Sequence, residues 1–359
     1  MEELAAGTVA ALGGLLGGVW LGFAARWGRF CTLKAIEDSA LGADSSGLRM
    51  WGLAIAVAAA GTYALDHAGL INIANSFYLM SPATIMATIA GGAIFGLGMA
   101  LVGTCGFGTL ARVGGGDLKS VVTFLVMGIT AYATLRGATA YLRLALFDTP
   151  QRVEAPASMA YSLASYAALS PHVAAYAIAV LIAFVCLLSS SFRQDRKKIV
   201  VGCLVGLTIV WGWVSTGIIA ADEFEPYPLE SFTFSAPLGE TIIYAMTMSG
   251  SYLKFGIGAV AGVVIGAALT SLSQGQFRWE ACDDAREMRR QILGGVFMGF
   301  GGVVALGCTV GQGLSAASML AWSAPAALVS IYVGAWLGLH YLVGGSLMGP
   351  IRSLLSVRQ

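Results

Sequence analysis

Nine stretches of the chain are long, apolar and almost free of charge, and this pattern limits the fold more than any other feature. A helix needs about 20 mainly apolar residues to cross a bilayer. Charged residues are only 11% of the chain, against about 25% in ordinary globular proteins, and the mean hydropathy is +0.78. The sequence therefore predicts an all-α polytopic membrane protein with one transmembrane domain, residues 1–359. The predicted spans are 8–25, 51–65, 83–102, 118–141, 172–191, 199–221, 252–272, 291–306 and 324–343.

Composition argues against several other classes. The net charge of +1 comes without a basic patch, so no nucleic acid partner is expected. Six cysteines, several of them inside apolar runs, do not predict a disulfide framework. The 48 glycines suit helices that pack closely in lipid. Prolines and polar residues in 148–171 and 222–250 predict surface loops, with short helices lying in the membrane interface.

Basic residues are unequally divided between the two sets of connections. Cytoplasmic loops carry an excess of Lys and Arg, whereas the opposite set is rich in acids such as Asp222, Glu223 and Glu225. We therefore expect the N-terminus outside and the C-terminus in the cytoplasm. The set expected in the cytoplasm holds Arg26, Arg29, Lys34, Arg49, Arg112, Lys119, Arg193, Arg196, Lys197, Lys198, Arg278, Arg286, Arg289, Arg290, Arg352 and Arg358.

A glycine and cysteine motif occurs twice. A shift of 203 positions, the separation of Cys105 and Cys308, superposes Gly96 on Gly299, Gly98 on Gly301 and Gly108 on Gly311. The two copies end spans three and eight, and this odd offset predicts that they run in opposite directions through the membrane. Such inverted repeats build a shared substrate site near the midplane. We expect a first repeat in 1–145, a connector in 146–198 and a second repeat in 199–359.

The segments that follow these two spans stay apolar. Gly103–Thr109 and Leu306–Met319 carry no charge, so we expect re-entrant segments that start short helices. Irregular backbone at membrane depth needs protein or water to satisfy its polar groups, and helix N-termini attract anions. This combination favours an anion in transit. The predicted substrate-binding residues are Cys105, Cys308, Thr104, Gly106, Gly108, Thr109, Gly311 and Gln312, with Gly313 as a further point of backbone approach.

A third cysteine breaks the symmetry. Cys31 follows the first span, on the expected cytoplasmic side, with Glu37 and Asp38 close behind, and no cysteine takes its place after the sixth span. We add Cys31 to the predicted site, because a path with direction needs unlike ends. Cys186 and Cys203 are interpreted as packing residues.

Two other functions are compatible with the same residues. Cys105 and Cys308 could exchange as a disulfide in a membrane thiol redox protein. Thiolate and thioether ligands also select Cu(I), so a soft-metal (copper) permease is a further alternative. The 13 methionines are scattered, however, and the three histidines are far apart in the sequence. We expect no cofactor, no bound metal and no enzyme activity.

The motifs resemble those of the YeeE/YedE family of sulfur-compound transporters, most closely its bacterial thiosulfate-uptake members. The resemblance rests on Arg29-Phe30-Cys31, on Phe95 to Thr109 around Cys105, and on Gly294 to Gly311 around Cys308. Members often carry Gly-Gly-Cys where this chain has Thr104 and Leu306 in its two copies.

The resemblance implies a helical bundle with pseudo-twofold symmetry in the bacterial inner membrane. It also implies that Cys31, Cys105 and Cys308 relay thiosulfate by transient S–H hydrogen bonds, and that a small cytoplasmic sulfur-carrier protein of the TusA type takes part. The predicted function is import of thiosulfate or a related sulfur anion. Because thiosulfate is a dianion, the relay requires neutral thiols.

Overall fold

The computed structural model describes residues 2–42, 44–80, 85–147, 156–221, 227–248, 252–282 and 284–344. Regular structure in these ranges is helical, apart from two isolated β-bridges. The elements are α1 (Glu2–Trp27), α2 (Thr32–Leu41), α3 (Ser46–His67), η1 (Ile73–Asn75), α4 (Phe77–Met80), α5 (Ile85–Val102), α6 (Gly106–Gly114), α7 (Leu118–Arg136), α8 (Ala138–Phe147), α9 (Met159–Ala167), α10 (Pro171–Leu187), α11 (Ser190–Gln194), α12 (Arg196–Val214), η2 (Ser215–Ile219), α13 (Ala236–Thr247), α14 (Phe255–Ser273), α15 (Ala285–Val304), η4 (Gly311–Ala316) and α16 (Ser323–Gly344).

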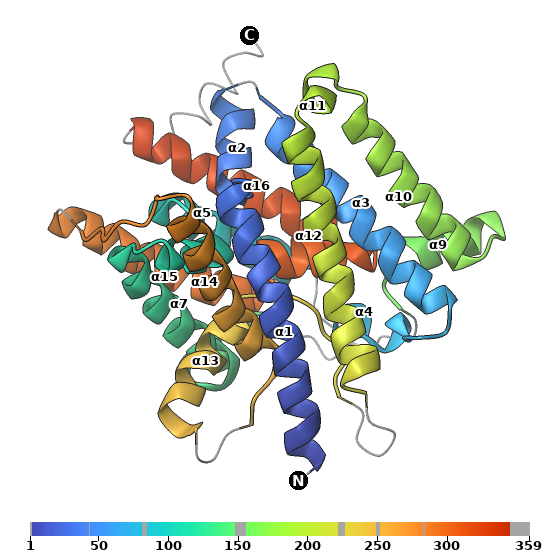
Figure 1. Cartoon of the computed structure of the whole chain (residues 1–359), viewed down its shortest axis with the longest axis horizontal. Coiled ribbons are helices and arrows are strands. Elements are labelled where there is room, and N and C mark those ends of the chain that lie inside the picture. Colours follow the sequence, from blue (N-terminus) through green and yellow to red (C-terminus); the bar gives the residue numbers. More distant parts are fainter. Residues whose placement is uncertain are drawn as a thin grey trace.

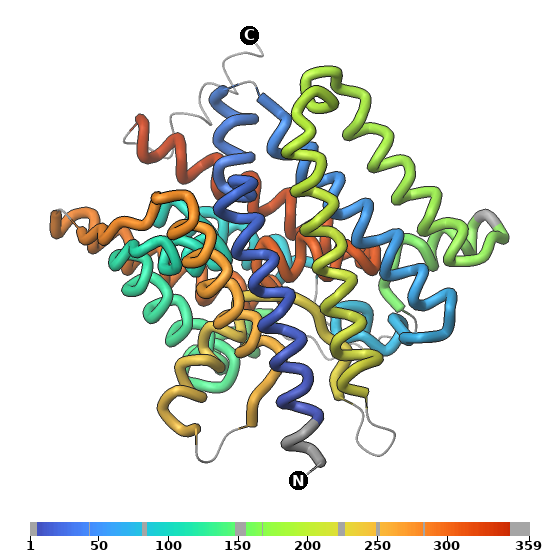
Figure 2. Tube along the Cα trace, viewed as in Figure 1, coloured from blue at the N-terminus to red at the C-terminus, as the bar shows by residue number. Residues whose placement is uncertain are grey.

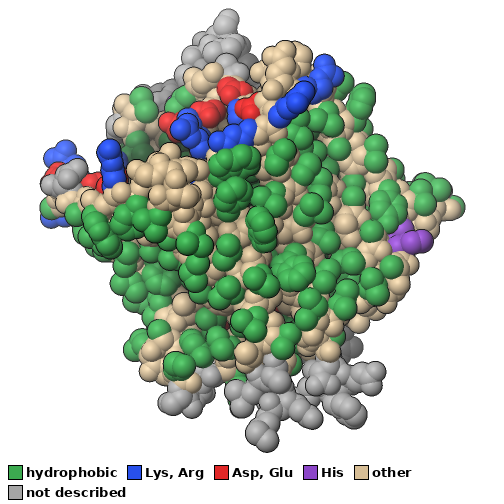
Figure 3. Space-filling model, viewed as in Figure 1, with side chains coloured by type: hydrophobic (Ala, Val, Ile, Leu, Met, Phe, Trp, Pro, Cys, Tyr) green, Lys and Arg blue, Asp and Glu red, His purple; other side chains and the backbone are tan. Residues whose placement is uncertain are grey.

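The prediction of an all-α polytopic membrane protein is confirmed. Within the described ranges, seven helices are long and apolar enough to cross a membrane, or eight if the sharply bent pair α9 and α10 is one span. Each predicted span overlaps a helix, but 118–141 is divided between α7 and α8, and 172–191 runs from α10 into α11. The helix α15 opens with charged residues, among them Arg286, Arg289 and Arg290. The count of nine spans stays a prediction. On the face shown in Figure 3, charged side chains gather toward the end of the molecule where α2 and α11 lie, beside a broad apolar surface.

Glycine ladders bring α1 and α14 into backbone contact. A Cβ added at Gly18 would lie 2.5 Å from the carbonyl oxygen of Ala259, and one at Gly262 would lie 2.2 Å from that of Leu15. The small-xxx-small spacing that permits this approach is typical of helix pairs in lipid. Figure 1 shows the two helices side by side at the front of the view. This contact fixes the end of α1, from which the chain turns into the Cys31 segment.

The glycine-rich helices α5 and α15 cross with a reciprocal contact. A Cβ at Gly91 would meet the carbonyl oxygen of Gly301 at 2.7 Å, and one at Gly301 would meet that of Gly91 at 2.6 Å. Gly98 and Gly294 face each other in the same way, at 2.6 and 2.7 Å. The helices are therefore antiparallel, and equivalent positions of the two copies exchange contacts, as a two-fold axis requires. These contacts support the inverted repeat, which stays a prediction.

The segment 227–235 corrects one expectation. It was predicted to lie in a surface loop, yet it enters the bundle as irregular backbone before α13, and Phe232 and Phe234 are fully buried. In Figure 2 it is the yellow stretch that leads into α13. The loop prediction is wrong here because two buried phenylalanines flank only one polar residue, Thr233, a pattern too short to register as a hydrophobic run.

Candidate functional site

Cys105 caps a short helix at the end of α5. Gly103 adopts a left-handed conformation (φ +84°), which suits glycine, and lets the chain reverse into α6. The Sγ of Cys105 accepts a hydrogen bond from the backbone N–H of Gly108 at 3.4 Å, and its carbonyl accepts one from that of Thr109 at 2.8 Å. The cysteine is fully buried. Its thiol therefore stands at a helix N-terminus inside the protein.

Cys308 repeats this geometry at the end of α15. Its Sγ accepts the N–H of Gly311 at 3.5 Å, and its carbonyl accepts that of Gln312 at 2.8 Å. It too is fully buried. The left-handed position before it is Leu306 (φ +59°), the counterpart of Gly103. A left-handed conformation costs a residue with a side chain roughly 1–2 kcal/mol. Leu306 therefore adopts the same turn as Gly103 although its own backbone preference opposes it.

Each buried sulfur has a second donor from a distant segment. The Thr32 hydroxyl donates to Cys105 Sγ at 3.9 Å, and the backbone N–H of Phe234 donates to Cys308 Sγ at 3.3 Å. Sequence reasoning missed both residues. Adjacency to Cys31 was a usable signal for Thr32. Nothing in the pattern around Phe234 indicates its place.

Cys31 stands beside the first of these caps. Arg29 is left-handed (φ +51°), so the chain turns after α1, and Phe30 is buried with its ring stacked on Trp51 at 4.6 Å. Cys31 then occupies the N-cap position of α2 and is half-buried. The Cys31 and Cys105 thiols are close enough to interact electrostatically, as are those of Cys105 and Cys308. The structure thus brings all three predicted cysteines together, and none of these three is in a disulfide.

A basic cavity leads to Cys31 and to the Cys105 cap. This cavity, the vestibule, has a volume of about 640 Å³ and reaches Cys31, Thr104 and Gly108. Six cations line it against three acids, and two of those acids are paired, in Lys34–Asp38 and Lys198–Asp195. Positive charge therefore prevails. Such a lining concentrates anions. The charged residues of the vestibule are Arg26, Arg29, Lys34, Arg112, Lys197, Lys198, Glu37, Asp38 and Asp195.

Two polar residues predicted as substrate ligands, Thr109 and Gln312, form hydrogen bonds within the protein. The Thr109 hydroxyl donates to the Cys105 carbonyl at 3.0 Å. The Gln312 amide nitrogen donates to the Ala305 carbonyl at 2.9 Å, and its oxygen accepts from Ser323 at 3.1 Å. In this conformation both side chains hold the turns around the cysteines.

The predicted glycines make room for neighbouring side chains. A Cβ at Gly108 would lie 2.0 Å from the hydroxyl oxygen of Thr104, and one at Gly311 would lie 2.4 Å from that of Thr233. Thr104 itself is buried, folded over Gly108. At Gly106 a Cβ would come within 2.7 Å of the Met127 methyl group.

Groups of three or more His, Cys, Asp or Glu that could hold a metal ion do not occur in the described ranges. The rings of His67 and His172 do meet, at 4.8 Å between centroids, with Asp66 at 3.7 Å from His172. These histidines are far apart in the sequence but neighbours at the ends of α3 and α10.

A helical membrane bundle with two capped thiols behind a cationic vestibule defines a membrane transport protein. Residues 27–337 match the family described as Sulphur transport, so the chain belongs to that family. It is 28% identical to the thiosulfate transporter TsuA of Escherichia coli K12, over 90% of this chain and 92% of the relative. It is 26% identical to the protein of the same name from Spirochaeta thermophila, over 90% and 96%. The predicted resemblance to sulfur-compound transporters is confirmed.

Proposed function

We propose that the chain imports thiosulfate, or a closely related sulfur anion, across the bacterial inner membrane without changing it chemically. The two relatives named thiosulfate transporters match it over nearly their whole length. The observation that carries the proposal is the pair of matching cysteine caps behind a cationic vestibule. The caps provide donors inside the protein, and the vestibule attracts a dianion at one end.

In this proposal the ion passes from Cys308 to Cys105 to Cys31 and leaves through the vestibule. Each thiol binds it in turn by an S–H hydrogen bond. The sulfurs of Cys105 and Cys308 accept hydrogen bonds from backbone N–H groups, and a thiol is both a weak donor and a weak acceptor. The S–H proton of each is therefore available to an anion. A thiolate would repel a dianion, so the relay requires that the thiols stay protonated.

We assign the barrier between the two buried thiols, those of Cys308 and Cys105, to Phe234. Its N–H bonds to Cys308 Sγ, and its ring packs against that of Phe107 with 5.5 Å between centroids. Its carbonyl oxygen lies 3.6 Å from the place of a Cβ on Gly106. One residue thus contacts both cysteine caps, and an ion must displace it to move from Cys308 to Cys105.

The far end is closed by Tyr78 and Thr233. The Tyr78 side chain hydrogen-bonds to that of Thr233, and both approach Gly311, within the Cys308 cap. We place this end outside the cell, with Tyr78 as the first hydroxyl that an incoming ion meets. The vestibule then opens to the cytoplasm, where a TusA-like sulfur carrier would receive the ion from Cys31.

The test is uptake of labelled thiosulfate by cells that lack other uptake routes. Cys31→Ala, Cys105→Ala and Cys308→Ala are compared with the wild type. Cys186→Ala is the matched control, since Cys186 is buried against Gly52 of α3, in α10. Membrane levels of each variant are measured, so that loss of protein is separated from loss of transport.

We expect normal uptake by the control and loss of uptake by the three site variants at comparable membrane levels. Normal uptake by all three would refute the site assignment. No thiosulfate uptake by the wild type would refute the substrate.

A further inference from the structure

A second basic cavity lies beside the vestibule. It has a volume of about 320 Å³ and sits between the end of α6, the start of α7 and the connection from α14 to α15. We call it the side cavity. Arg26 and Arg112 line both cavities, whereas Lys119 and Arg278 line only the side cavity. Two guanidinium groups therefore form a shared wall.

Three consecutive glycines build this cavity. A Cβ at Gly114 would lie 2.5 Å from the Val264 carbonyl oxygen of α14, so α6 ends against that helix. At Gly115 the guanidinium of Arg26 occupies the place of a side chain, 1.3 Å from a would-be Cβ. Gly116 is left-handed (φ +96°) and faces the carbonyl oxygen of Arg278. A side chain at any of the three positions would have to displace α14, Arg26 or the connection.

The connection is tied to the glycine turn by backbone hydrogen bonds. The N–H of Arg278 donates to the Gly115 carbonyl at 3.1 Å, and that of Glu280 donates to Gly116 at 3.2 Å. The N–H of Leu118 donates back to Glu280 at 2.8 Å. The cavity thus has a fixed frame on the side that carries Arg278.

The side cavity has more positive than negative charge available. Lys119 pairs with Glu287 at 3.1 Å, and the Asp117 carboxylate accepts from the Lys119 N–H at 3.1 Å and from the Ser120 hydroxyl at 2.9 Å. Arg278 forms no ion pair within the part of the chain that the structure describes. With Lys119 paired to Glu287, three arginines line the cavity, Arg26, Arg112 and Arg278, against the two carboxylates of Asp117 and Glu280.

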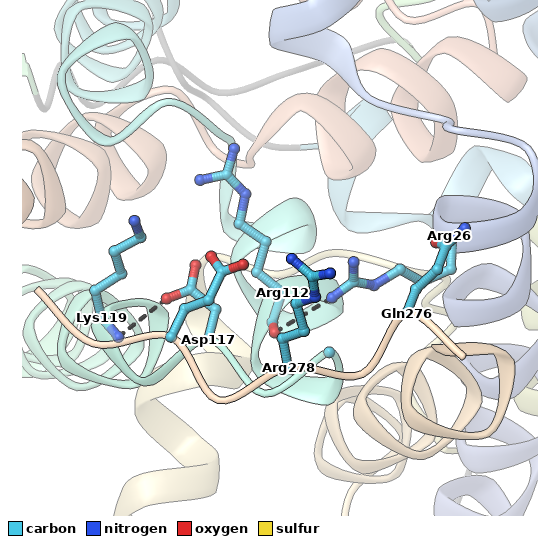
Figure 4. Close-up of a pocket in the computed structure, with 8 residues that line it drawn as sticks. Arg26, Arg112, Asp117, Lys119, Gln276 and Arg278 are labelled. Atoms are coloured by element: carbon cyan, nitrogen blue, oxygen red, sulfur yellow. Dashed lines mark hydrogen bonds between the residues drawn. The ribbon is translucent and has the colours of Figure 1, made fainter. Parts of the chain in front are cut away.

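Arg26 lies within electrostatic reach of one cation and two carboxylates. Arg112 repels it, whereas Asp117 and Glu280 attract it. Figure 4 shows Arg26 reaching across to the main chain of Arg112, to whose carbonyl it donates at 3.5 Å. A guanidinium fork suits a tetrahedral oxyanion, and a divalent one would relieve this repulsion.

The same guanidiniums hold the Cys105 cap. Arg112 Nη2 donates to the Gly103 carbonyl at 2.7 Å, at the left-handed turn before the cysteine. Arg26 Nε donates to the Ala111 carbonyl of α6 at 3.0 Å. An anion in the side cavity competes for these N–H groups, so its binding bears on the position of the Cys105 turn.

We propose that the side cavity binds a divalent tetrahedral oxyanion of the sulfate class from the face on which the vestibule opens, and that the bound anion slows delivery past Cys105. The binding stands on the cavity itself; the effect on delivery rests on the proposed transport function. Anion that accumulates on the receiving side then limits further import.

Binding is tested with inorganic sulfate on the purified full-length chain in detergent. Thermal unfolding is measured in sulfate and in chloride at equal ionic strength, for the wild type, Arg278→Ala and Arg290→Ala. Arg290 is an exposed arginine of α15 that lines neither cavity. We expect sulfate to stabilise the wild type and Arg290→Ala beyond chloride, and Arg278→Ala to lose most of that difference. An unchanged sulfate effect in Arg278→Ala would overturn the site.

Regulation is tested with right-side-out membrane vesicles loaded with sulfate or with chloride. Internal sulfate should slow thiosulfate uptake by the wild type and by Arg290→Ala but not by Arg278→Ala, whose uptake into chloride-loaded vesicles should be normal. Equal slowing of all three would overturn the regulatory role. If the wild type takes up no thiosulfate at all, the transport proposal fails, while the detergent measurement still decides the binding.

A phospholipid headgroup carries the same oxyanion chemistry. The detergent measurement is therefore repeated with anionic phospholipid in place of sulfate. Stabilisation by the lipid but not by sulfate, dependent on Arg278, would overturn the assignment to a free oxyanion.

Discussion

Gly108 is the residue of the Cys105 cap with the least room for a side chain. The Thr104 hydroxyl fills the space beside it, 2.0 Å from a would-be Cβ. Gly108→Ala should therefore push Thr104 away and distort the N–H that bonds to Cys105 Sγ. We expect uptake to fall at least about tenfold, which corresponds to about 1.4 kcal/mol, at normal membrane levels.

The Thr104→Ala, Gly108→Ala double variant is the control for this prediction. It removes the clashing hydroxyl and should recover part of the lost uptake. If the double variant is no better than Gly108→Ala alone, the clash is not the cause of the defect.

Glu230 gives a pH dependence of stability. It is half-buried, and its carboxylate accepts a hydrogen bond from the Tyr227 hydroxyl at 3.0 Å. Burial raises the pKa of Glu230 from 4.5 to about 7. The nearby Glu240 acts in the same direction, whereas Tyr227 and Lys254 oppose it, and Tyr78 also lies within electrostatic reach. Between these pH values the folded protein binds more protons at this site than the unfolded chain.

The free energy of unfolding should consequently fall as pH rises from about 4.5 to about 7. The contribution of Glu230 is at most about 3 kcal/mol. Thermal unfolding in detergent across this range should show the decline in the wild type and in Glu37→Gln, an exposed control. The decline should be smaller in Glu230→Gln. Identical pH profiles for all three proteins would contradict this assignment.

At the scale of single residues, the sequence reveals the thiols but not their surroundings. Cys105 and Cys308 stand out because their glycine neighbours recur at a fixed offset. Phe234 and Arg26 act through contacts with residues far away in the sequence. Such contacts produce no repeating sequence pattern, so the role of neither residue could be assigned from the sequence. The predicted roles of Thr104, Gly108 and Gln312 in binding stay predictions.

Among the elements, the α1–α14 contact depends most on glycine. Gly262→Val would place a branched side chain where a Cβ already meets the Leu15 carbonyl oxygen at 2.2 Å. Overpacking of this kind costs roughly 1–3 kcal/mol, so thermal stability and the yield of folded protein should fall. Gly344→Val, at the open end of α16 with nothing within 4 Å, should behave like the wild type. Equal stability of the two variants would show that the ladder does not hold the helices together.

Helices were predictable where an apolar run has the length of a span, as in α3, α5 and α12. Short irregular elements were not. The irregular segment 227–235 neighbours several acids in the sequence, and those charges favoured a surface loop. The segment is buried because it fills the space between η2 and the Cys308 cap. That space exists only once the helices have assembled.

For the whole molecule, the evidence for the inverted repeat is a set of reciprocal contacts between α5 and α15. Gly91 meets Gly301 and Gly98 meets Gly294, so equivalent helices of 1–145 and 199–359 touch through equivalent positions. We propose these two repeats, joined by the connector 146–198, as the organisation of the bundle. In this proposal Cys31 belongs to the first repeat alone, so the two ends of the proposed path differ.

Orientation can be checked with Cys282, in the connection between α14 and α15. If the basic end is cytoplasmic, a membrane-impermeant maleimide should not label Cys282 in intact cells. In permeabilised cells it should label the wild type more strongly than Cys282→Ala. Labelling from outside that disappears in Cys282→Ala would reverse the orientation.

The central claim is that thiosulfate crosses by contact with a buried thiol at Cys105. The direct measurement is uptake of labelled thiosulfate by the purified protein in proteoliposomes, comparing the wild type, Cys105→Ala and Cys186→Ala at equal amounts of folded protein. The relay predicts uptake by the wild type and by Cys186→Ala and none above protein-free vesicles by Cys105→Ala. Uptake by Cys105→Ala at the wild-type rate would contradict it.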